Sequence, residues 1–464
     1  MNLKNHPHLL RKYNCPLLFV FFILTLTIMH AGKYAVAEEK VLPPDLLNHP
    51  NKTSDTQNDE QLSEEKINEL LSLPYLQGNT NAPKARNTVL YKKDLSESGP
   101  NFYLSSGTFE IFLIDMKGNI LHTWRTPNNE NTSIMSSAIL LKNGEIIFSR
   151  HKKTVIKLDK HSNVLWSYST DPHHTMDIDE EGNIYVLSAK DKIISESVSI
   201  QDNFIEILNP DGKLFKKISL YSLFNNYPDP SILEHMMRIP VLAPLNDGEV
   251  DFPFFEHARG GATKIPDPLD SKKEKDEANE NHPKYDVFHA NSIQAFDGKW
   301  TSKSPAFQKG NLLVSLRNSG FLLIINPRTE SIEWLLGPKL WRRGQHDAQL
   351  LANGNMLIFN NLSSLERSKV TEFDPLTQKI IWEYSTDDGK FYSEVLGAAQ
   401  RLPGGNTLII QGASGRAFEV TPAKEIVWEF YNPNQANRNL DLISNILLMQ
   451  RLPKDYPLDW TKTK

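Results

Sequence analysis

Cysteine is nearly absent from this sequence of 464 residues: the single one, Cys15, lies in the N-terminal leader. A chain that loses this leader has no thiol, so cysteine-based catalysis, cysteine metal ligation and disulfides are excluded. A lipid-attachment cysteine would follow the apolar run of the leader, whereas Cys15 precedes it. Stability must come from a buried core, for which a hydrophobic content of 39% with eight tryptophans is sufficient.

A surplus of basic residues is also missing, because 51 lysines and arginines stand against 56 acidic residues. The net charge of −5 makes nucleic acid an unexpected partner. The chain also lacks the His-Glu-x-x-His, Walker-type, Gly-x-Ser-x-Gly and EF-hand motifs. These absences argue against zincin, nucleotide-hydrolysing, serine-hydrolase and calcium-sensing functions.

A long hydrophobic run is lacking as well. The N-terminal run, Pro16 to Met29, covers fourteen residues, which is too short to span a bilayer comfortably. Basic residues precede it at positions 4, 11 and 12, and residues 35–37 (Ala-Val-Ala) offer a cleavage site. Residues 1–37 are therefore predicted to be a signal peptide of a secreted or periplasmic protein without a stable membrane span. An uncleaved anchor is the alternative.

The rest of the chain divides at about residue 86. Residues 38–85 are polar and poor in aromatic residues, which predicts a linker with one short helix. From residue 86 onward, short alternating strands are separated by Asn-Gly, Asp-Gly and Gly-Asn turns. This pattern predicts an all-β domain over residues 86–464 behind a short N-terminal extension.

Two internal repeats indicate the architecture. One is an apolar pair, a turn and a strand; the other is a strand, a turn and a second strand that closes on an aromatic residue. Copies of the second repeat end at Trp124, Trp166, Phe215, Trp334, Trp382 and Trp428. Neighbouring tryptophans are 42, 48 and 46 residues apart, a length that fits four short strands. Six copies predict a six-bladed β-propeller, with the tryptophans filling the gaps between blades.

The third unit is longer than the others. Phe215 and Trp334 are 119 residues apart, which predicts a long insert at about residues 222–285. Its aromatic part, residues 251–257, is a candidate lid or rim, and its charged part is expected to be solvated. The C-terminal tail from Leu447 is expected to supply a strand that closes the ring.

Histidines recur at one position of the repeat. Eight residues separate His346 from Gly354, and the same offset separates His174 from Gly182. Aligning the turns places Ser136, His174, His346 and Gly397 at equivalent positions, and the strand that His289 opens adds this residue to the set. Because the innermost strand of each blade lines the channel, these side chains are expected to converge at one mouth.

Arg317 lies in a strand with the sequence of a channel strand, on the blade of His289. Since an unpaired buried guanidinium is costly, it should face either an Asp or Glu carboxylate or a ligand oxyanion. A guanidinium with several imidazoles suits a sulfate or phosphate ester. Asp177 and Asp347 follow two of the histidines and could orient an imidazole or cap a strand. A tris-histidine metal site is conceivable, but no metal is predicted because Arg317 would repel a cation.

Four ordered segments carry a family resemblance: residues 286–293 (Asp-Val-Phe-His-Ala-Asn-Ser-Ile), 314–318 (Val-Ser-Leu-Arg-Asn), 332–337 (Ile-Glu-Trp-Leu-Leu-Gly) and 345–355, which begins Gln-His-Asp-Ala. Together they resemble the arylsulfotransferases, the bacterial-type aryl-sulfate sulfotransferases that do not use PAPS. The resemblance is densest over residues 285–432 and extends more weakly to about residue 105.

The resemblance implies a propeller enzyme that transfers a sulfuryl group from a phenolic sulfate ester to a phenol through a sulfohistidine. By position, His346 resembles the nucleophile, and His289, His174 and Arg317 resemble the sulfuryl-binding and acid–base partners. Asn291 resembles a supporting substrate-binding residue. We therefore expect an aryl sulfate donor and a phenolic acceptor as small-molecule partners and no cofactor, with homo-oligomer formation left open.

Two other functions remain open from the residues. A non-catalytic propeller could bind an anionic ligand or partner in the same basic channel. A quinoprotein-like dehydrogenase also has tryptophan-ended repeats, although this sequence lacks the carboxylate cluster that its metal would need.

Overall fold

The structure is a computed structural model that describes residues 86–127, 135–195, 198–238, 284–341, 343–364, 367–437 and 440–462. All of these residues belong to one compact unit, residues 62–464. Residues 1–85, for which the signal peptide, linker and short helix are predicted, lie outside the described residues. The same holds for residues 239–283, which include the candidate lid and the charged part of the insert.

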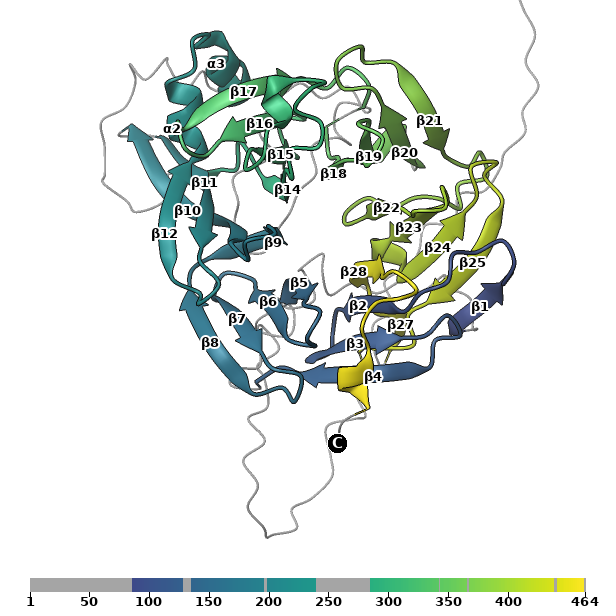
Figure 1. The fold of residues 1–464 in the computed structure, drawn as a ribbon. Coiled ribbons are helices and arrows are strands. Elements are labelled where there is room, and N and C mark those ends of the chain that lie inside the picture. The colour runs from purple at the N-terminus through teal and green to yellow at the C-terminus, as the bar shows by residue number, and fades with distance from the viewer. Residues whose placement is uncertain are drawn as a thin grey trace, which may run out of the picture. The chain divides into compact units, whose positions relative to one another are not determined.

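Six antiparallel sheets surround a central axis (Figure 1). In chain order from the innermost strand outward, the first three blades are β28 (Ile446–Arg451), β2 (Asn101–Ser105), β3 (Glu110–Ile114) and β4 (Ile120–Arg125); β5 (Met135–Leu140), β6 (Ile146–Arg150), β7 (Thr154–Leu158) and β8 (Val164–Ser169); and β9 (Pro172–Ile178), β10 (Ile184–Ser195), β11 (Val198–Leu208) and β12 (Leu214–Ser219). The short strand β13 (Lys284–Tyr285) pairs in parallel with β11.

The other three blades have the same order. They are β14 (Ala290–Ala295), β15 (Leu312–Leu316), β16 (Leu322–Asn326) and β17 (Ser331–Leu336); β18 (His346–Leu350), β19 (Met356–Ser364), β20 (Arg367–Phe373) and β21 (Ile380–Tyr384); and β22 (Ala398–Arg401), β23 (Thr407–Gln411), β24 (Arg416–Val420) and β25 (Ile426–Tyr431), with β1 (Asn87–Tyr91) added outside β25. The prediction of an all-β six-bladed propeller is confirmed.

A few shorter elements lie outside the six sheets. A hairpin of β26 (Gln435–Asn437) and β27 (Leu440–Ile443) precedes β28, and 3₁₀ turns occupy Pro305–Phe307, Gly412–Ser414 and Asp459–Thr461. After β12 come the helices α2 (Leu220–Asn225) and α3 (Ser231–Arg238). Within the described part of the chain, neither helix has the length and apolar character needed to cross a membrane.

The C-terminal strand closes the ring. β28 pairs antiparallel with β2, so that Arg451 stands opposite Asn101. The first blade therefore takes its innermost strand from the end of the chain and its other three strands from the beginning, as predicted for the tail. Joining distant parts of the chain in one sheet prevents the ring from opening at that blade.

The hydrophobic core is divided among the blade interfaces. Each of six buried apolar clusters draws its members from two neighbouring blades. One example packs Phe102 and Trp124 of the first blade against Phe148 and Leu158 of the second. Because burial of apolar surface drives folding, each blade is stabilised mainly by its neighbours.

The repeated tryptophans lie at these interfaces, as predicted. In four blades the indole N–H donates to a backbone carbonyl of the next blade: Trp124 to Gly144, Trp166 to Pro210, Trp382 to Pro422 and Trp428 to Met116. Trp334 packs in the cluster between the fourth and fifth blades. Phe215, the aromatic residue that ends the third copy of the repeat, is 61% exposed instead. A phenyl ring has no N–H to donate, and this blade continues directly into α2.

Candidate active site

Hydrogen bonds between neighbouring inner strands define the layers of the channel. A side-chain oxygen on one inner strand accepts from a backbone N–H on the next: Ser137 from Met176, Thr175 from Ile293, Ser292 from Ala348, and Asp347 from Ala399. The four acceptors therefore occupy one layer. The residues before the acceptors, with Gly397 before Ala398 on β22, form the next layer: Ser136, His174, Asn291, His346 and Gly397.

This register confirms the predicted equivalence of Ser136, His174, His346 and Gly397 and corrects the placement of His289. Asn291 occupies the equivalent position in the fourth blade, and His289 lies two residues earlier. His289 nevertheless reaches the site, because its φ of 47° and the bulge between Ala290 and Ser292 turn the chain there. Its Nε2 lies 2.8 Å from Nε2 of His174.

Similar backbone irregularities mark the other site strands. His174 has a φ of 61° and Asp347 a φ of 53°, the left-handed region that side chains other than glycine rarely adopt. The pairing register shifts beside each of them, between Val186 and Ser188 and between His346 and Gln349. Such strain is typical of functional sites, where it aims a side chain that a regular strand would direct elsewhere.

The layer of His174 and His346 encloses a small chamber of about 90 Å³. Its lining residues include Ser136, His151, His174, Asn291, His346 and Leu396. This volume is well below the several hundred Å³ of pockets that enclose whole drug-sized ligands. The chamber therefore has room for a small chemical group only.

His346, which opens β18, has its tautomer set by Asn361 on β19. The Asn361 amide donates from Nδ2 to the carbonyl oxygens of Ser393 (2.9 Å) and Leu396 (2.6 Å). Its Oδ1 therefore faces Nδ1 of His346, at 2.7 Å. The Gly344 carbonyl oxygen lies 3.1 Å from the same Nδ1, and both oxygens can only accept. The proton of the neutral imidazole must lie on Nδ1, which leaves the lone pair on Nε2.

The protonation state of His346 agrees with this arrangement. Burial lowers the pKa of His346 to about 3, and the charge of the nearby Arg317 guanidinium acts in the same direction. The imidazole is therefore neutral at pH 7. Its nucleophilic form is the resting form of the site.

His174, His289 and Asp286 form a second hydrogen-bonded group. The Asp286 carboxylate accepts from the backbone N–H of His289 (3.0 Å) and from Nδ1 of the same residue. His289 Nδ1 is thus a donor, and the contact between the Nε2 atoms of His289 and His174 needs one proton between them. Burial lowers the pKa of His174 well below its ordinary value. One proton therefore lies between the two rings, and the ring of His174 is centred 6.0 Å from that of His346.

Arg317 is buried, with 7% of its surface exposed, next to these histidines. Its backbone N–H donates to the His289 carbonyl oxygen and its own carbonyl oxygen accepts from Gly344 N–H, which ties the two histidine strands together. Its guanidinium donates to Asn318 Oδ1 at 3.0 Å. The charge of Arg317 also opposes the rise that burial causes in the pKa of Glu394. The guanidinium is therefore hydrogen-bonded to an amide and is near enough to Glu394 for its charge to act on that carboxyl group.

Asn291 contributes a polar wall to the chamber. Its Nδ2 donates to the Gln345 carbonyl oxygen at 2.7 Å. Its buried Oδ1 has no hydrogen-bond partner among the described residues. An unsatisfied buried acceptor is costly, so it marks a place where a ligand hydroxyl or water fits.

Four site residues were not predicted from the sequence. His173 stands beside His174, with ring centres 4.2 Å apart, and His151 lines the chamber. Asp286 stands at the head of the motif that contains His289, and its carboxylate three residues earlier was an available signal. Asn361 had no such signal, because only the fold brings it to His346. Among the described residues, His173, His174 and His289 also have the arrangement to hold a metal ion.

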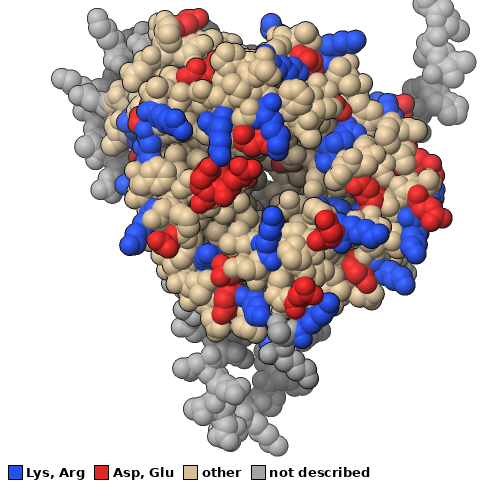
Figure 2. Space-filling model, viewed as in Figure 1, with Lys and Arg blue, Asp and Glu red and all other residues tan. Residues whose placement is uncertain are grey.

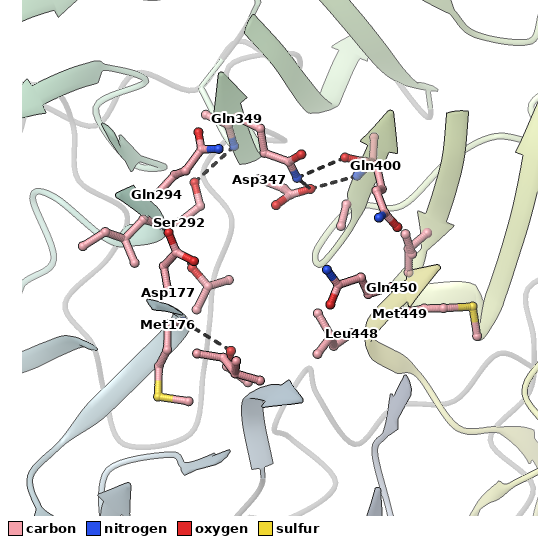
Figure 3. Close-up of a pocket in the computed structure, with 18 of the residues that line it drawn as sticks. Met176, Asp177, Ser292, Gln294, Asp347, Gln349, Gln400, Leu448, Met449 and Gln450 are labelled. Carbon is pink, nitrogen blue, oxygen red and sulfur yellow. Dashed lines mark hydrogen bonds between the residues drawn. The ribbon is translucent and has the colours of Figure 1, made fainter. Parts of the chain in front are cut away.

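A larger chamber of about 570 Å³ continues the channel beyond the acceptor layer. Thr175, Asp347, Ala398 and Leu448 line both chambers. Figure 3 shows Asp177 and the carboxamides of Gln294, Gln349, Gln400 and Gln450 around this second space. Burial raises the pKa of Asp177 to about 6. On the face seen in Figure 2, acidic and basic side chains are interspersed around the opening.

Comparison with known proteins identifies the family of the chain. Solved structures with similar folds include a protein of unknown function from Bacteroides caccae, with 13% identity and a TM-score of 0.45 over 75% of this chain and 98% of that one. Another is a streptogramin B lyase, with 11% identity and a TM-score of 0.42 over 80% and 96% of the two chains. No curated protein matches the sequence. The arylsulfotransferase (ASST) family matches residues 137–433, which hold His174, His289, Arg317 and His346. The chain belongs to the arylsulfotransferase family.

Proposed function

We propose that the protein transfers a sulfuryl group from a phenolic sulfate ester to a phenol, with His346 as the nucleophile. The observation that carries this proposal is the bond between Asn361 Oδ1 and His346 Nδ1, because it leaves the His346 Nε2 lone pair on the chamber wall. A neutral imidazole with a fixed tautomer is ready to attack an electrophilic sulfur without prior proton transfer.

In the first half-reaction, His346 Nε2 attacks the ester sulfur and the bond from sulfur to the aryl oxygen breaks. The departing phenolate takes the proton held between His174 and His289. Asp286 accepts from Nδ1 of His289 and keeps Nε2 of that ring directed at His174 during the transfer. In the second half-reaction an acceptor phenol returns a proton to the pair, its oxygen attacks the sulfur, and the nitrogen–sulfur bond breaks.

Charge in the transferred group needs fixed donors. Sulfuryl oxygens carry negative charge in the transition state. Arg317 is the charged residue that acts most strongly on the pKa of His346, so its guanidinium is the donor expected to stabilise these oxygens. The Asn291 Oδ1 acceptor suits the hydroxyl group of the incoming phenol. A sulfuryl group is small enough for the 90 Å³ chamber, while the aromatic part of the ester remains outside it.

A turnover assay tests the proposal. The mature protein should release p-nitrophenol from p-nitrophenyl sulfate in proportion to the phenol that it sulfates, with parallel double-reciprocal lines. His346→Ala should lower kcat by roughly 10⁴-fold or more, as expected for loss of a covalent nucleophile. His161→Ala, which removes an exposed histidine, is the matched control and should keep full activity. Robust turnover by His346→Ala would refute the proposal.

The non-catalytic alternative predicts a different result. A propeller that only binds anions would show no turnover with any aryl sulfate, yet sulfated compounds would raise its Tm. Measuring Tm with and without the donor in the same experiment separates the two functions.

A further inference from the structure

We propose that His173, His174 and His289 also form a binding site for a transition-metal ion of the zinc class, and that its occupancy switches sulfuryl transfer off. Metal binding at this site stands independently of the proposed function, whereas the switching rests on it. The site differs from one formed by the three histidines of the sequence repeat, because His173 replaces His346. The charge of Arg317, which argued against a metal from the sequence, acts on the pKa of His346, whereas the pKa values of His173 and His174 are lowered mainly by burial and by neighbouring histidines.

The three imidazoles are already assembled around one point. Each offers a ring nitrogen within 4.8 Å of those of the other two. Their ring centres are 4.2 Å apart for His173 and His174 and 4.8 Å apart for each of the other two pairs. Tetrahedral zinc with bonds of about 2.0–2.1 Å keeps its ligand atoms about 3.3 Å apart. Small ring rotations bring the three nitrogens to that spacing.

The backbone around the cluster favours such a role. His173 and His174 are adjacent on β9, and His289 approaches from the start of the neighbouring blade. Both His174 and His289 hold left-handed backbone conformations. The cluster therefore converges because of two strained positions on two different blades, and a regular pair of strands would not produce it.

Asp286 supplies the outer partner that a metal-bound histidine usually has. Its carboxylate accepts from Nδ1 of His289, while Nε2 of that ring points at His174. A carboxylate that holds the far nitrogen orients the imidazole and makes its free nitrogen a better ligand. The arrangement of carboxylate, histidine and open Nε2 matches that of zinc ligands.

The donor set also selects the class of ion. Three neutral nitrogen donors without a carboxylate oxygen among them suit Zn²⁺, Co²⁺, Ni²⁺ and Cu²⁺. Mg²⁺ and Ca²⁺ prefer oxygen ligands and should not bind there.

Metal binding at this site and sulfuryl transfer exclude each other. The metal takes the lone pairs of His174 and His289, between which the proton for the leaving phenolate is held. His346 lies outside the group of three histidines whose ring nitrogens come within 4.8 Å of one another, and its ring is centred 6.0 Å from that of His174. A metal-loaded protein therefore retains its nucleophile and lacks its proton donor.

Calorimetric titration of untagged, chelator-treated protein with ZnCl₂ tests the binding. We expect one Zn²⁺ per chain, no heat of binding with MgCl₂, and at least about ten-fold weaker Zn²⁺ binding in His173→Gln and in Asp286→Asn. His151→Gln is the matched control, since its ring is centred 5.6 Å from His173 but lies outside the donor set. His151→Gln and His346→Ala should both bind Zn²⁺ like the wild type.

Two results would overturn the site: no Zn²⁺ binding by the wild type, or equal binding by His173→Gln. If the Tm of His173→Gln shows that this variant does not fold, the Asp286→Asn titration decides.

Transfer activity tests the switch separately. Zn²⁺ should abolish wild-type turnover and EDTA should restore it. Whatever turnover His173→Gln retains should be the same with and without Zn²⁺. Full activity of the Zn²⁺-loaded wild type would refute the switch. A wild type that binds Zn²⁺ but has no transfer activity even without Zn²⁺ would refute only the proposed function.

Discussion

At the scale of single residues, an asparagine decides which nitrogen of His346 can react. Asn361 can donate only from Nδ2, and two carbonyl oxygens occupy that group, so its oxygen is committed to His346 Nδ1. Hydrogen bonding at one ring nitrogen fixes the tautomer and thus the chemistry of the other. In the proposed reaction, Asn361 is therefore a positioning residue that acts through His346.

Removing this constraint should slow chemistry without weakening substrate binding. In Asn361→Leu, the His346 proton can move to Nε2, and we expect kcat to fall about 10²–10⁴-fold with little change in KM, since a wrong tautomer has a comparable effect in catalytic triads. Steady-state kinetics with p-nitrophenyl sulfate measures this split.

Ser368→Ala is the matched control for that experiment. Ser368 Oγ accepts from the backbone N–H of Ser393 and donates to the backbone carbonyl oxygen of Asn361, so its loss disturbs the same loop while leaving the Asn361 side chain on His346. It should lower Tm while kcat stays near the wild-type value. Equal losses of kcat in both variants would assign Asn361 a structural role only.

The low pKa of His346 predicts the pH dependence of the first half-reaction. An ordinary imidazole of pKa about 6.5 loses its nucleophilic form as the pH falls through that value. In the folded protein the pKa is about 3, so protonation, and the loss of the nucleophile, is displaced to lower pH. We expect the single-turnover rate of p-nitrophenol release to stay level from pH 8 to pH 5 in quenched-flow measurements. A decline that follows a pKa near 6.5 would contradict the assignment.

Sequence spacing was sufficient to find His346 and His174, because both follow the strict offset to a turn glycine. It could not place His289, since the bulged backbone beside Ala290 brings in a residue from outside the repeat position. It could not find Asn361 either. Hydrogen bonds across strands leave no trace in spacing along the chain, whereas a repeated strand does.

At the scale of elements, glutamine side chains join neighbouring inner strands. Gln294 Oε1 accepts from Leu350 N–H and its Nε2 donates to the Leu350 carbonyl oxygen. Gln400 does the same with Arg451, at 2.8 and 3.0 Å. A side-chain amide that satisfies both backbone groups of one residue adds a pair of hydrogen bonds between blades that share no sheet.

Loss of one such clamp should destabilise the ring. In Gln400→Leu, the backbone N–H and C=O of Arg451 lose their partner, and we expect a decrease in the free energy of unfolding of about 1–3 kcal/mol. Urea unfolding followed by tryptophan fluorescence measures it. Gln450→Leu, an exposed position in the same channel (Figure 3), should be near neutral. Comparable losses in both variants would show that the clamp contributes nothing specific.

The aromatic repeat was predictable at this scale because an indole combines a large apolar surface with an N–H donor. It fills an interblade gap and also reaches a turn carbonyl of the next blade, as Trp124 does with Gly144. Phe215 fits the sequence pattern but not the physical reason for it. An aromatic residue without a donor is a weaker indicator of an interface.

At the scale of the whole molecule, closure of the ring combines strand pairing with a buried ion pair. Arg451 on β28 donates to Glu419 at 2.9 Å, and both side chains are almost fully buried. Arg451 also donates to Asn101 Oδ1 of β2, its partner strand. The pair joins the two ends of the ring. Six repeats and a C-terminal strand were predictable from the sequence, whereas this pairing of residues far apart along the chain was not.

The ring also explains why the site has its composition. The chain places one residue in the same layer at each of the inner strands β5, β9, β14, β18 and β22, so five positions converge without any long loop. Substitution within the repeat is then enough to change the chemistry of that layer. Ser136, Asn291 and Gly397 take places equivalent to His174 and His346. A site assembled this way needs only a few departures from the repeat.

Trapping the covalent intermediate tests the central claim most directly. The mature protein is mixed with p-nitrophenyl sulfate without acceptor, quenched in alkali, digested and analysed by mass spectrometry. We expect one sulfuryl group on the peptide that contains His346, at one equivalent per chain, and its loss when phenol is added before the quench. Transfer activity without label on this peptide, or label on a different residue that phenol removes, would contradict the account.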